Sequence, residues 1–359
     1  MKLNINAGLI LRILAGVLLL VLAWYFSDLV LYIFLAFIFS LIGKPIATKI
    51  SSARIFKRNI PYGVSSMMAM LFFILVFSLI LFFFIPMLTR EARAIANINY
   101  DELSVSLNYL LDSLQDFLHE NGLMDNQETL VGLVTSEIKD FASLTAFSSI
   151  LGQVVSLTGS FLFALFSVFF LTFFFIKDDF RIDNLTRVLF NARHAVRLTS
   201  VSEKINNLLS RYFIGLLIEI VSMITLLYIG MAIFGIKGAL LMAFFGGMLN
   251  AIPYLGPLIG TICACLFGVV DCLSGSNYQA IFPTILQIGG TFIAANLIDN
   301  IVLQPIIYSQ SVKAHPVEIF LVIIMGGSLA GIPGMLFAIP VYTIVRTVTV
   351  ELFNYAHEK

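Results

Sequence analysis

The sequence predicts an all-α, polytopic transmembrane protein with about eight membrane segments. Of its 359 residues, 59% are hydrophobic and only 12% are charged, and the mean hydropathy is +0.98. Soluble domains carry about 45–50% apolar and about 25% charged residues. Apolar runs of about 20 residues, the length that crosses a bilayer, follow one another along the chain. This composition excludes a soluble enzyme and a nucleic-acid-binding module, because too little polar surface is available to cover a water-exposed fold.

Residues 1–88 are predicted to form three transmembrane helices, from apolar runs at 9–26, 29–43 and 62–88. The first run is longer than the apolar part of a signal peptide, which is about 7–15 residues, and no small-residue cleavage site follows it. We therefore interpret it as a membrane helix. The loop at 44–58 carries five basic residues and no acid, which predicts a cytoplasmic position.

Residues 89–148 are predicted to form an extracytoplasmic helical insert. Positions 89–147 hold ten acidic residues and three basic ones. Leucines recur at spacings of three and four between Asp101 and Glu120, which indicates an amphipathic helix. The insert is interpreted as a helical cap, and a contact with an oligomer partner is the alternative. With this insert outside, both termini are expected in the cytoplasm.

A fourth transmembrane helix is predicted at 149–176, followed by a basic interfacial helix at 177–211. This basic stretch holds seven Lys and Arg residues and has helical periodicity. Anionic lipid of the inner leaflet attracts such side chains, so membrane lipid is an expected partner. A cytoplasmic gate is the alternative interpretation.

The last third of the chain contains an internal repeat with an offset of 80 residues, at 212–272 and 280–349. Each copy combines an acid-bearing helix (212–234 or 280–307) with an apolar hairpin broken at Ile-Pro. The matching motifs are Gly246-Gly247-Met-Leu249-Asn-Ala-Ile252-Pro253 with Gly326-Gly327-Ser-Leu329-Ala-Gly-Ile332-Pro333, and Leu217-Ile218-Glu219 with Leu297-Ile298-Asp299. Hairpin arms of about 15 residues are short for a full span, so we expect re-entrant hairpins and two repeats of inverted topology.

The predicted site lies where polar residues interrupt these apolar segments. A carboxylate at the bilayer centre costs at least about 2.5–3.5 kcal/mol, so each acid should face a cavity, be paired or be protonated. Helix spacing places Asn296, Asp299 and Asn300 on one face, with Gln304 one turn on. Pro253 and Pro333 interrupt the helical hydrogen bonds and leave backbone N–H and C=O groups unpaired. Such groups are tolerated at membrane depth only inside protein or along a cavity. Helix–helix hydrogen bonding and structural kinks are the alternatives. The predicted substrate- or ion-binding residues are Glu219, Asn250, Pro253, Asn296, Asp299, Asn300, Gln304 and Pro333.

No catalytic residues, metal ligands or cofactor are predicted, and the chain is not expected to be an enzyme. No phosphate-binding Gly-x-x-x-x-Gly-Lys-Ser/Thr loop occurs, and all four histidines lie outside the predicted spans. The three cysteines fall within ten residues, without the further ligands that a zinc site needs. The net charge of zero gives no indication of a nucleic-acid partner. An aspartyl dyad of Glu219 and Asp299 lacks a supporting motif.

Several motifs resemble the autoinducer-2 exporter family, the AI-2E family transporters or PerM-like permeases. The resemblance covers the whole chain, and its specific motifs lie after about residue 205. They are Arg211-Tyr212, Asn-Ala-Ile-Pro-Tyr-Leu-Gly-Pro-Leu-Ile-Gly at 250–260, Asp299…Leu303-x-Pro305…Val312-x-x-His315-Pro316, and Gly-Ile-Pro-Gly-Met-Leu-Phe-Ala-Ile-Pro at 331–340. This sequence has Asp299 where many relatives carry Glu, and Ser309 where Gly is common. Because of these two differences, the resemblance does not identify the transported substrate.

The resemblance implies a secondary transporter of a bacterial inner membrane that exports a small polar solute such as autoinducer-2, a quorum-sensing signal. It also implies a homo-oligomer, with a pentamer as the expected form. Alternating access, with coupling to sodium ion or proton, is the expected mechanism. A sodium/proton antiporter with Glu219 and Asp299 as coupling acids is one alternative. A membrane scaffold that transports nothing is another.

Overall fold

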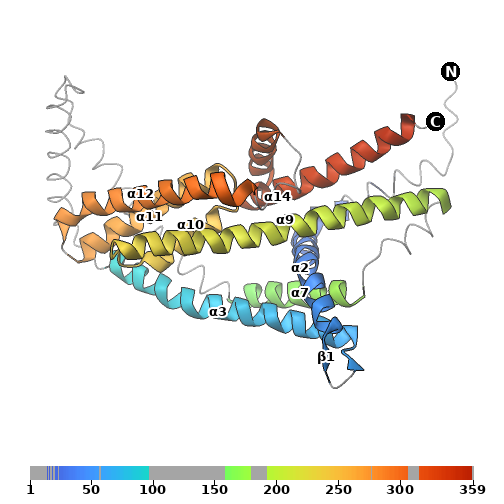
Figure 1. Cartoon of the computed structure of the whole chain (residues 1–359), viewed down its shortest axis with the longest axis horizontal. Helices are drawn as coiled ribbons and strands as arrows, with labels where there is room; N and C mark the ends of the chain where they lie inside the picture. Colours follow the sequence, from blue (N-terminus) through green and yellow to red (C-terminus); the bar gives the residue numbers. More distant parts are fainter. Residues whose placement is uncertain are drawn as a thin grey trace. The chain divides into compact units, whose positions relative to one another are not determined.

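The computed structural model describes residues 24–55, 58–96, 158–178, 192–275, 277–305 and 315–357, together with isolated positions between 14 and 22. These residues are almost entirely helical (Figure 1). Six helices in this part of the chain are long and apolar enough to span a membrane, which confirms the prediction of an all-α polytopic fold. Most of the predicted helix at 9–26, of the insert at 89–148 and of the stretch at 179–191 lies outside the described residues.

One compact unit comprises residues 1–77 and 157–206. Its described elements are α2 (Ser27–Ser52), a ribbon of β1 (Arg54–Ile55) and β2 (Arg58–Asn59), the first part of α3 (Tyr62–Ala96), α7 (Thr158–Lys177) and the start of α9 (Ala192–Ile233). Helix α2 extends to Ser52, so much of the loop predicted at 44–58 is helical. The helices pack closely because small residues lie between them: a Cβ at Gly43 would be 2.5 Å from Ile176 Cδ1.

The second unit comprises residues 78–156 and 207–359 and contains both repeats. Its further elements are α10 (Ala239–Leu249), α11 (Leu255–Ser274), η1 (Tyr278–Ala280), α12 (Ile281–Ile298), the π-helical segment η2 (Asp299–Leu303) and α14 (Pro316–His357). Helices α9, α10, α11 and α12 share one buried apolar cluster. Phe292 of α12 fills the space beside Gly246, where a Cβ would lie 2.6 Å from the ring.

Helix α9 continues across one predicted helix boundary. The sequence predicts a basic interfacial helix that ends at 211 and a transmembrane helix that begins at 212, whereas α9 is continuous from Ala192 to Ile233. Buried side chains at Leu209, Tyr212 and Leu216 continue at helical spacing across the predicted boundary. The basic composition ends near residue 211, but the helix does not. No proline and no glycine pair occurs in this stretch to interrupt it.

Both apolar hairpins are present, and they break at equivalent positions. In the first hairpin, α10 ends at Leu249 and α11 begins at Leu255. In the second, the backbone of α14 leaves the helical region at Ala330 and Gly331, 80 residues after Asn250 and Ala251. A Cβ on Gly334 would overlap the carbonyl oxygen of Gly326, so the two arms of α14 fold back onto each other.

The two arms of the first hairpin differ in length. Helix α10 has 11 residues and α11 has 20, so the predicted length of about 15 residues per arm does not hold for α11. Helix α11 is long enough to cross a bilayer. The prolines lie in or near the first turn after each break, where a missing N–H costs little. The re-entrant arrangement and the inverted topology stay predictions.

Candidate functional site

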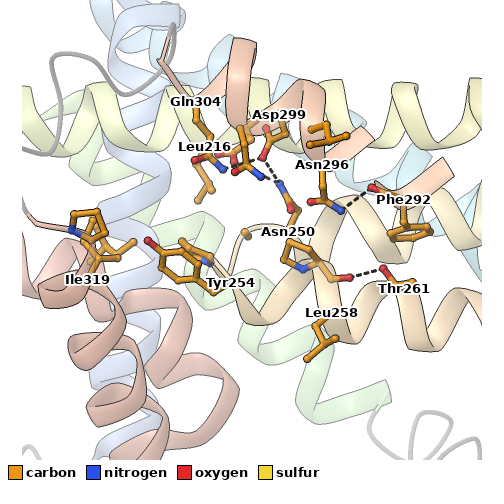
Figure 2. A pocket seen from close by; sticks show the side chains of 18 of the residues that line it. Leu216, Asn250, Tyr254, Leu258, Thr261, Phe292, Asn296, Asp299, Gln304 and Ile319 are labelled. Carbon is orange, nitrogen blue, oxygen red and sulfur yellow. Dashed lines mark hydrogen bonds between the residues drawn. The ribbon is translucent and has the colours of Figure 1, made fainter. Parts of the chain in front are cut away.

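A cavity of about 780 Å³ lies within the second unit (Figure 2). Its walls come from α9, the turn between α10 and α11, the first turns of α11, α12 with η2, and α14, so both repeats contribute. Seven of the eight predicted site residues line it: Glu219, Asn250, Pro253, Asn296, Asp299, Asn300 and Gln304. Pro333 does not line the cavity. The second hairpin contributes residues of its arms, such as Ile319 and Ile339, and not its tip.

The equivalent acids of the two repeats meet at one amide. Glu219 and Asp299 are 4% and 1% exposed. The Nδ2 atom of Asn250 donates to Glu219 Oε1 at 3.4 Å and to Asp299 Oδ2 at 3.5 Å (Figure 2). Both bonds are at the long end of the hydrogen-bond range. Because Asn250 caps the C-terminus of α10, the hairpin turn sets the position of its amide. We call these three residues the acid–amide cluster.

Asp299 is also held by Gln304. The Nε2 atom of Gln304 donates to Asp299 Oδ2 at 2.9 Å, and the backbone N–H of Gln304 donates to the carbonyl oxygen of Asp299. This spacing of five residues belongs to a π-helix, and π-turns are frequent at functional sites. The other carboxylate oxygen, Oδ1, is buried and has no hydrogen-bond partner among the described residues. It is therefore an acceptor available to a ligand or a proton.

Two further polar side chains of the cavity wall already bond to their own helices. Asn296 Nδ2 donates to the carbonyl oxygen of Phe292 at 2.8 Å, and Thr261 Oγ1 donates to the carbonyl oxygen of Pro257 at 2.6 Å. Helix hydrogen bonding, the alternative that the sequence leaves open, thus accounts for part of the polarity at Asn296. Asn300 is exposed.

The sequence interpretation missed two tyrosines that line the cavity. Tyr212 is buried and lies seven residues before Glu219, which places it two turns away on the same face of α9. That spacing could have identified it. Tyr254 lies in the turn between α10 and α11, and its position depends on a backbone conformation that no pattern in the sequence indicates.

The lining has a clear chemical character. It contains two carboxylic acids, four side-chain amides and two tyrosines, and no Lys, Arg or His belongs to this described set. Such a wall offers hydrogen-bond acceptors and neutral donors among apolar contacts. It suits a neutral hydroxylated molecule or a cation and disfavours an anion, because no positive charge would compensate the anion there.

The comparisons with known proteins identify a family of transporters. The profile of the AI-2E family transporters matches residues 13–354. "Putative transport protein YueF" of Bacillus subtilis (strain 168) is 24% identical over 299 residues, which are 82% of this chain and 77% of YueF. "Putative transport protein YrrI" of the same strain is 28% identical over 189 residues, or 53% of this chain and 51% of YrrI. "Putative permease PerM" of Escherichia coli (strain K12) is 24% identical over 178 residues, 50% of this chain and 48% of PerM. The chain is a multi-pass membrane protein, and it belongs to the AI-2E family of transporters.

Proposed function

We propose that this transporter exports a small polar organic molecule, such as autoinducer-2, by alternating access, and that the cavity is its binding site. The observation that carries the proposal is the acid–amide cluster. It joins the equivalent acids of two repeats through the tip of a broken hairpin, inside a cavity. Transporters built from repeats bind their substrates at the repeat interface, beside discontinuous helices.

The size and chemistry of the cavity support a small hydroxylated solute. Small-molecule sites occupy about 300–1,000 Å³, and a volume of about 780 Å³ falls in that range. Hydroxyl groups of a solute would donate to the carboxylates of Glu219 and Asp299 and accept from the side-chain amides. The apolar wall, which includes Phe292 and Leu216, would contact its carbon skeleton.

We further propose a bacterial inner membrane as the location, with both termini in the cytoplasm. The basic charge of residues 44–58 and the acidic charge of residues 89–148 support this orientation. A homo-oligomer is the assembly that the family resemblance favours. A proton or sodium gradient would drive the transport, because buried carboxylic acids can alternate between a bound and a free form during a cycle.

One observation favours a second candidate, a sodium/proton antiporter. Asp299 Oδ1 is a buried carboxylate oxygen without a hydrogen-bond partner among the described residues, and Glu219 shares the amide of Asn250 with the same carboxylate. A pair of acids with an open acceptor can hold a proton or a small cation. In an antiporter, ion exchange would depend mainly on the two acids and only weakly on the side-chain amides.

The test is transport by purified protein in liposomes. Wild type, Asp299→Asn, Asn250→Ala and Asp271→Asn would be compared, with labelled autoinducer-2 and internal pH followed together, with and without a sodium gradient. Asp271 is the matched control, because it is a half-buried acid of α11 that does not line the cavity.

Three outcomes are distinguishable. Solute flux that is lost in Asp299→Asn and in Asn250→Ala, but kept in Asp271→Asn, supports the exporter. Sodium-dependent proton movement without solute flux, lost in Asp299→Asn and kept in Asn250→Ala, replaces the exporter with the antiporter. No flux of either kind from folded wild-type protein refutes both and favours the scaffold.

A further inference from the structure

Tyr254 has an unusual backbone conformation at the wall of the cavity. Its φ and ψ are 67° and −49°, and the N–H of Leu255 donates to the carbonyl oxygen of Pro253 at 2.8 Å. Together these describe a γ-turn of the rare, strained kind with a positive φ at its central residue. Among the described residues, the other three with positive φ are glycines: Gly235, Gly238 and Gly331.

The surrounding turn leaves Tyr254 little freedom to relax. Pro253 precedes it with a fixed φ. Gly256 follows it closely, and a Cβ there would overlap the carbonyl oxygen of Leu249. The N–H of Gly256 also donates to the carbonyl oxygen of Ile252 at 2.8 Å. Strain of this kind persists only where neighbouring contacts hold the residue in place.

The second repeat shows that a hairpin of this kind does not need a tyrosine. Its positive-φ residue is Gly331, and the position equivalent to Tyr254 is Gly334, which packs directly against Gly326. Glycine would remove the strain in the first hairpin as well. The tyrosine is therefore not explained by the needs of the turn, and the use of its side chain is the natural explanation.

The side chain of Tyr254 forms part of the cavity wall. It is 53% exposed and lines the cavity wall. Figure 2 shows it between Asn250, on the side of the acid–amide cluster, and Ile319 of α14. Its ring meets the ring of Phe320 edge to face, with centroids 6.0 Å apart and an angle of 78° between the planes. The two rings thus connect the tip of the first hairpin with the first arm of the second. We call them the aromatic constriction.

We infer that Tyr254 is a specificity-determining residue of the cavity, and that the aromatic constriction limits the size of the molecules that reach the acid–amide cluster. The turn fixes the backbone that carries the ring, and the ring of Phe320 packs against the ring of Tyr254. This inference rests on the proposed function for its biological meaning, since the cavity must be a transport site for its selectivity to matter. The geometry of the constriction can be tested without transport.

The test measures access to a cysteine inside the cavity. Asn296→Cys would be introduced into protein whose native Cys263, Cys265 and Cys272 are replaced by alanine. The rates of modification by N-ethylmaleimide and by fluorescein maleimide, a much bulkier reagent, would be compared in Tyr254, Tyr254→Phe and Tyr254→Gly backgrounds. Tyr228→Ala is the matched control, because Tyr228 is an exposed tyrosine of α9 that does not line the cavity.

We expect the bulky reagent to react about tenfold faster in Tyr254→Gly, with a change of less than about threefold for the small reagent. Tyr254→Phe and Tyr228→Ala should keep the wild-type ratio of the two rates. Phe320→Ala should shift the ratio in the same direction as Tyr254→Gly, which provides a second variant if the glycine variant does not fold.

An unchanged ratio in both folded Tyr254→Gly and folded Phe320→Ala would overturn the inference, as would failure of both reagents to react in every variant. Solute flux through protein that keeps Asn296, with and without the substitutions at Tyr254 and Phe320, separates the two proposals. A changed ratio without any wild-type flux would leave the constriction in place and refute the transport function. Normal wild-type flux with an unchanged ratio would support the transport function and refute the constriction.

Discussion

Gly256→Ala is the substitution with the most direct structural consequence. A Cβ at this position would overlap the carbonyl oxygen of Leu249 and lie 2.6 Å from its carbonyl carbon and 3.0 Å from the Cα of Asn250. These are backbone atoms, so no side-chain rotation relieves the overlap. The turn between α10 and α11 must open, and Asn250 must move with it.

The magnitude follows from what Asn250 then loses. Its bonds of 3.4 Å to Glu219 and 3.5 Å to Asp299 are already at the upper limit of hydrogen-bond distance, so a shift of about 1 Å breaks both. Two long bonds to acids contribute about 1 kcal/mol each. Overpacking adds about 1–3 kcal/mol. The free energy of unfolding should fall by about 3–5 kcal/mol, which corresponds to a loss of thermal stability on the order of 10 °C.

The assay is thermal unfolding of detergent-purified protein, together with solute flux in liposomes. Gly289→Ala is the control, since nothing lies within 4 Å of a Cβ at that mid-helix position of α12. Alanine there should be neutral or stabilising by up to about 1 kcal/mol. We expect flux to fall at least about tenfold in Gly256→Ala and to persist in Gly289→Ala. A Gly256→Ala protein with the melting temperature and flux of wild type would refute the described turn.

Three further predictions concern single side chains. An impermeant maleimide should label Cys272 from the extracytoplasmic side of oriented vesicles, and labelling only from the cytoplasmic side would refute the predicted topology of the first hairpin. Pro257→Ala should change the free energy of unfolding by less than about 1 kcal/mol, measured by thermal denaturation, because Pro257 lies in the first turn of α11. Tyr342→Phe removes the hydroxyl that donates to Glu318 between the arms of α14 and should cost no more than about 1 kcal/mol, because the pair is exposed. A loss well above 1 kcal/mol in either thermal measurement would contradict these assignments.

The sequence predicted the membrane fold and the two breaks because their causes are local. Apolar runs have few alternatives in a bilayer, and the glycine and proline pattern near Asn250 recurs 80 residues later at Ala330. The continuity of α9 through residue 211 was not predicted, because charge composition changes along this helix without any residue that ends it.

Most of the candidate site was predictable for a related reason. A carboxylic acid within an apolar helix is costly, so Glu219 and Asp299 had to face polar partners, and Asn250 is the one they share. The bond from Gln304 to Asp299 was not predictable. Residues five apart do not face each other on an α-helix, and only the π-helical segment brings these two side chains together. The positive φ of Tyr254 also depends on tertiary packing and leaves no local pattern.

The π-helical segment has a mechanical consequence. The hydrogen bonds of a π-helix join residues five apart, whereas those of an α-helix join residues four apart. Conversion of the segment to α-helix would therefore shift the following residues by one position along the helix. One residue of α-helix corresponds to a rotation of about 100°. The end of the segment at Gln304 would swing away from Asp299, while the earlier turns of α12, anchored by Ile288 and Phe292, would stay in place. The carboxylate could thus gain and lose its amide partner by a slip of register within one helix, without any displacement of the hairpins.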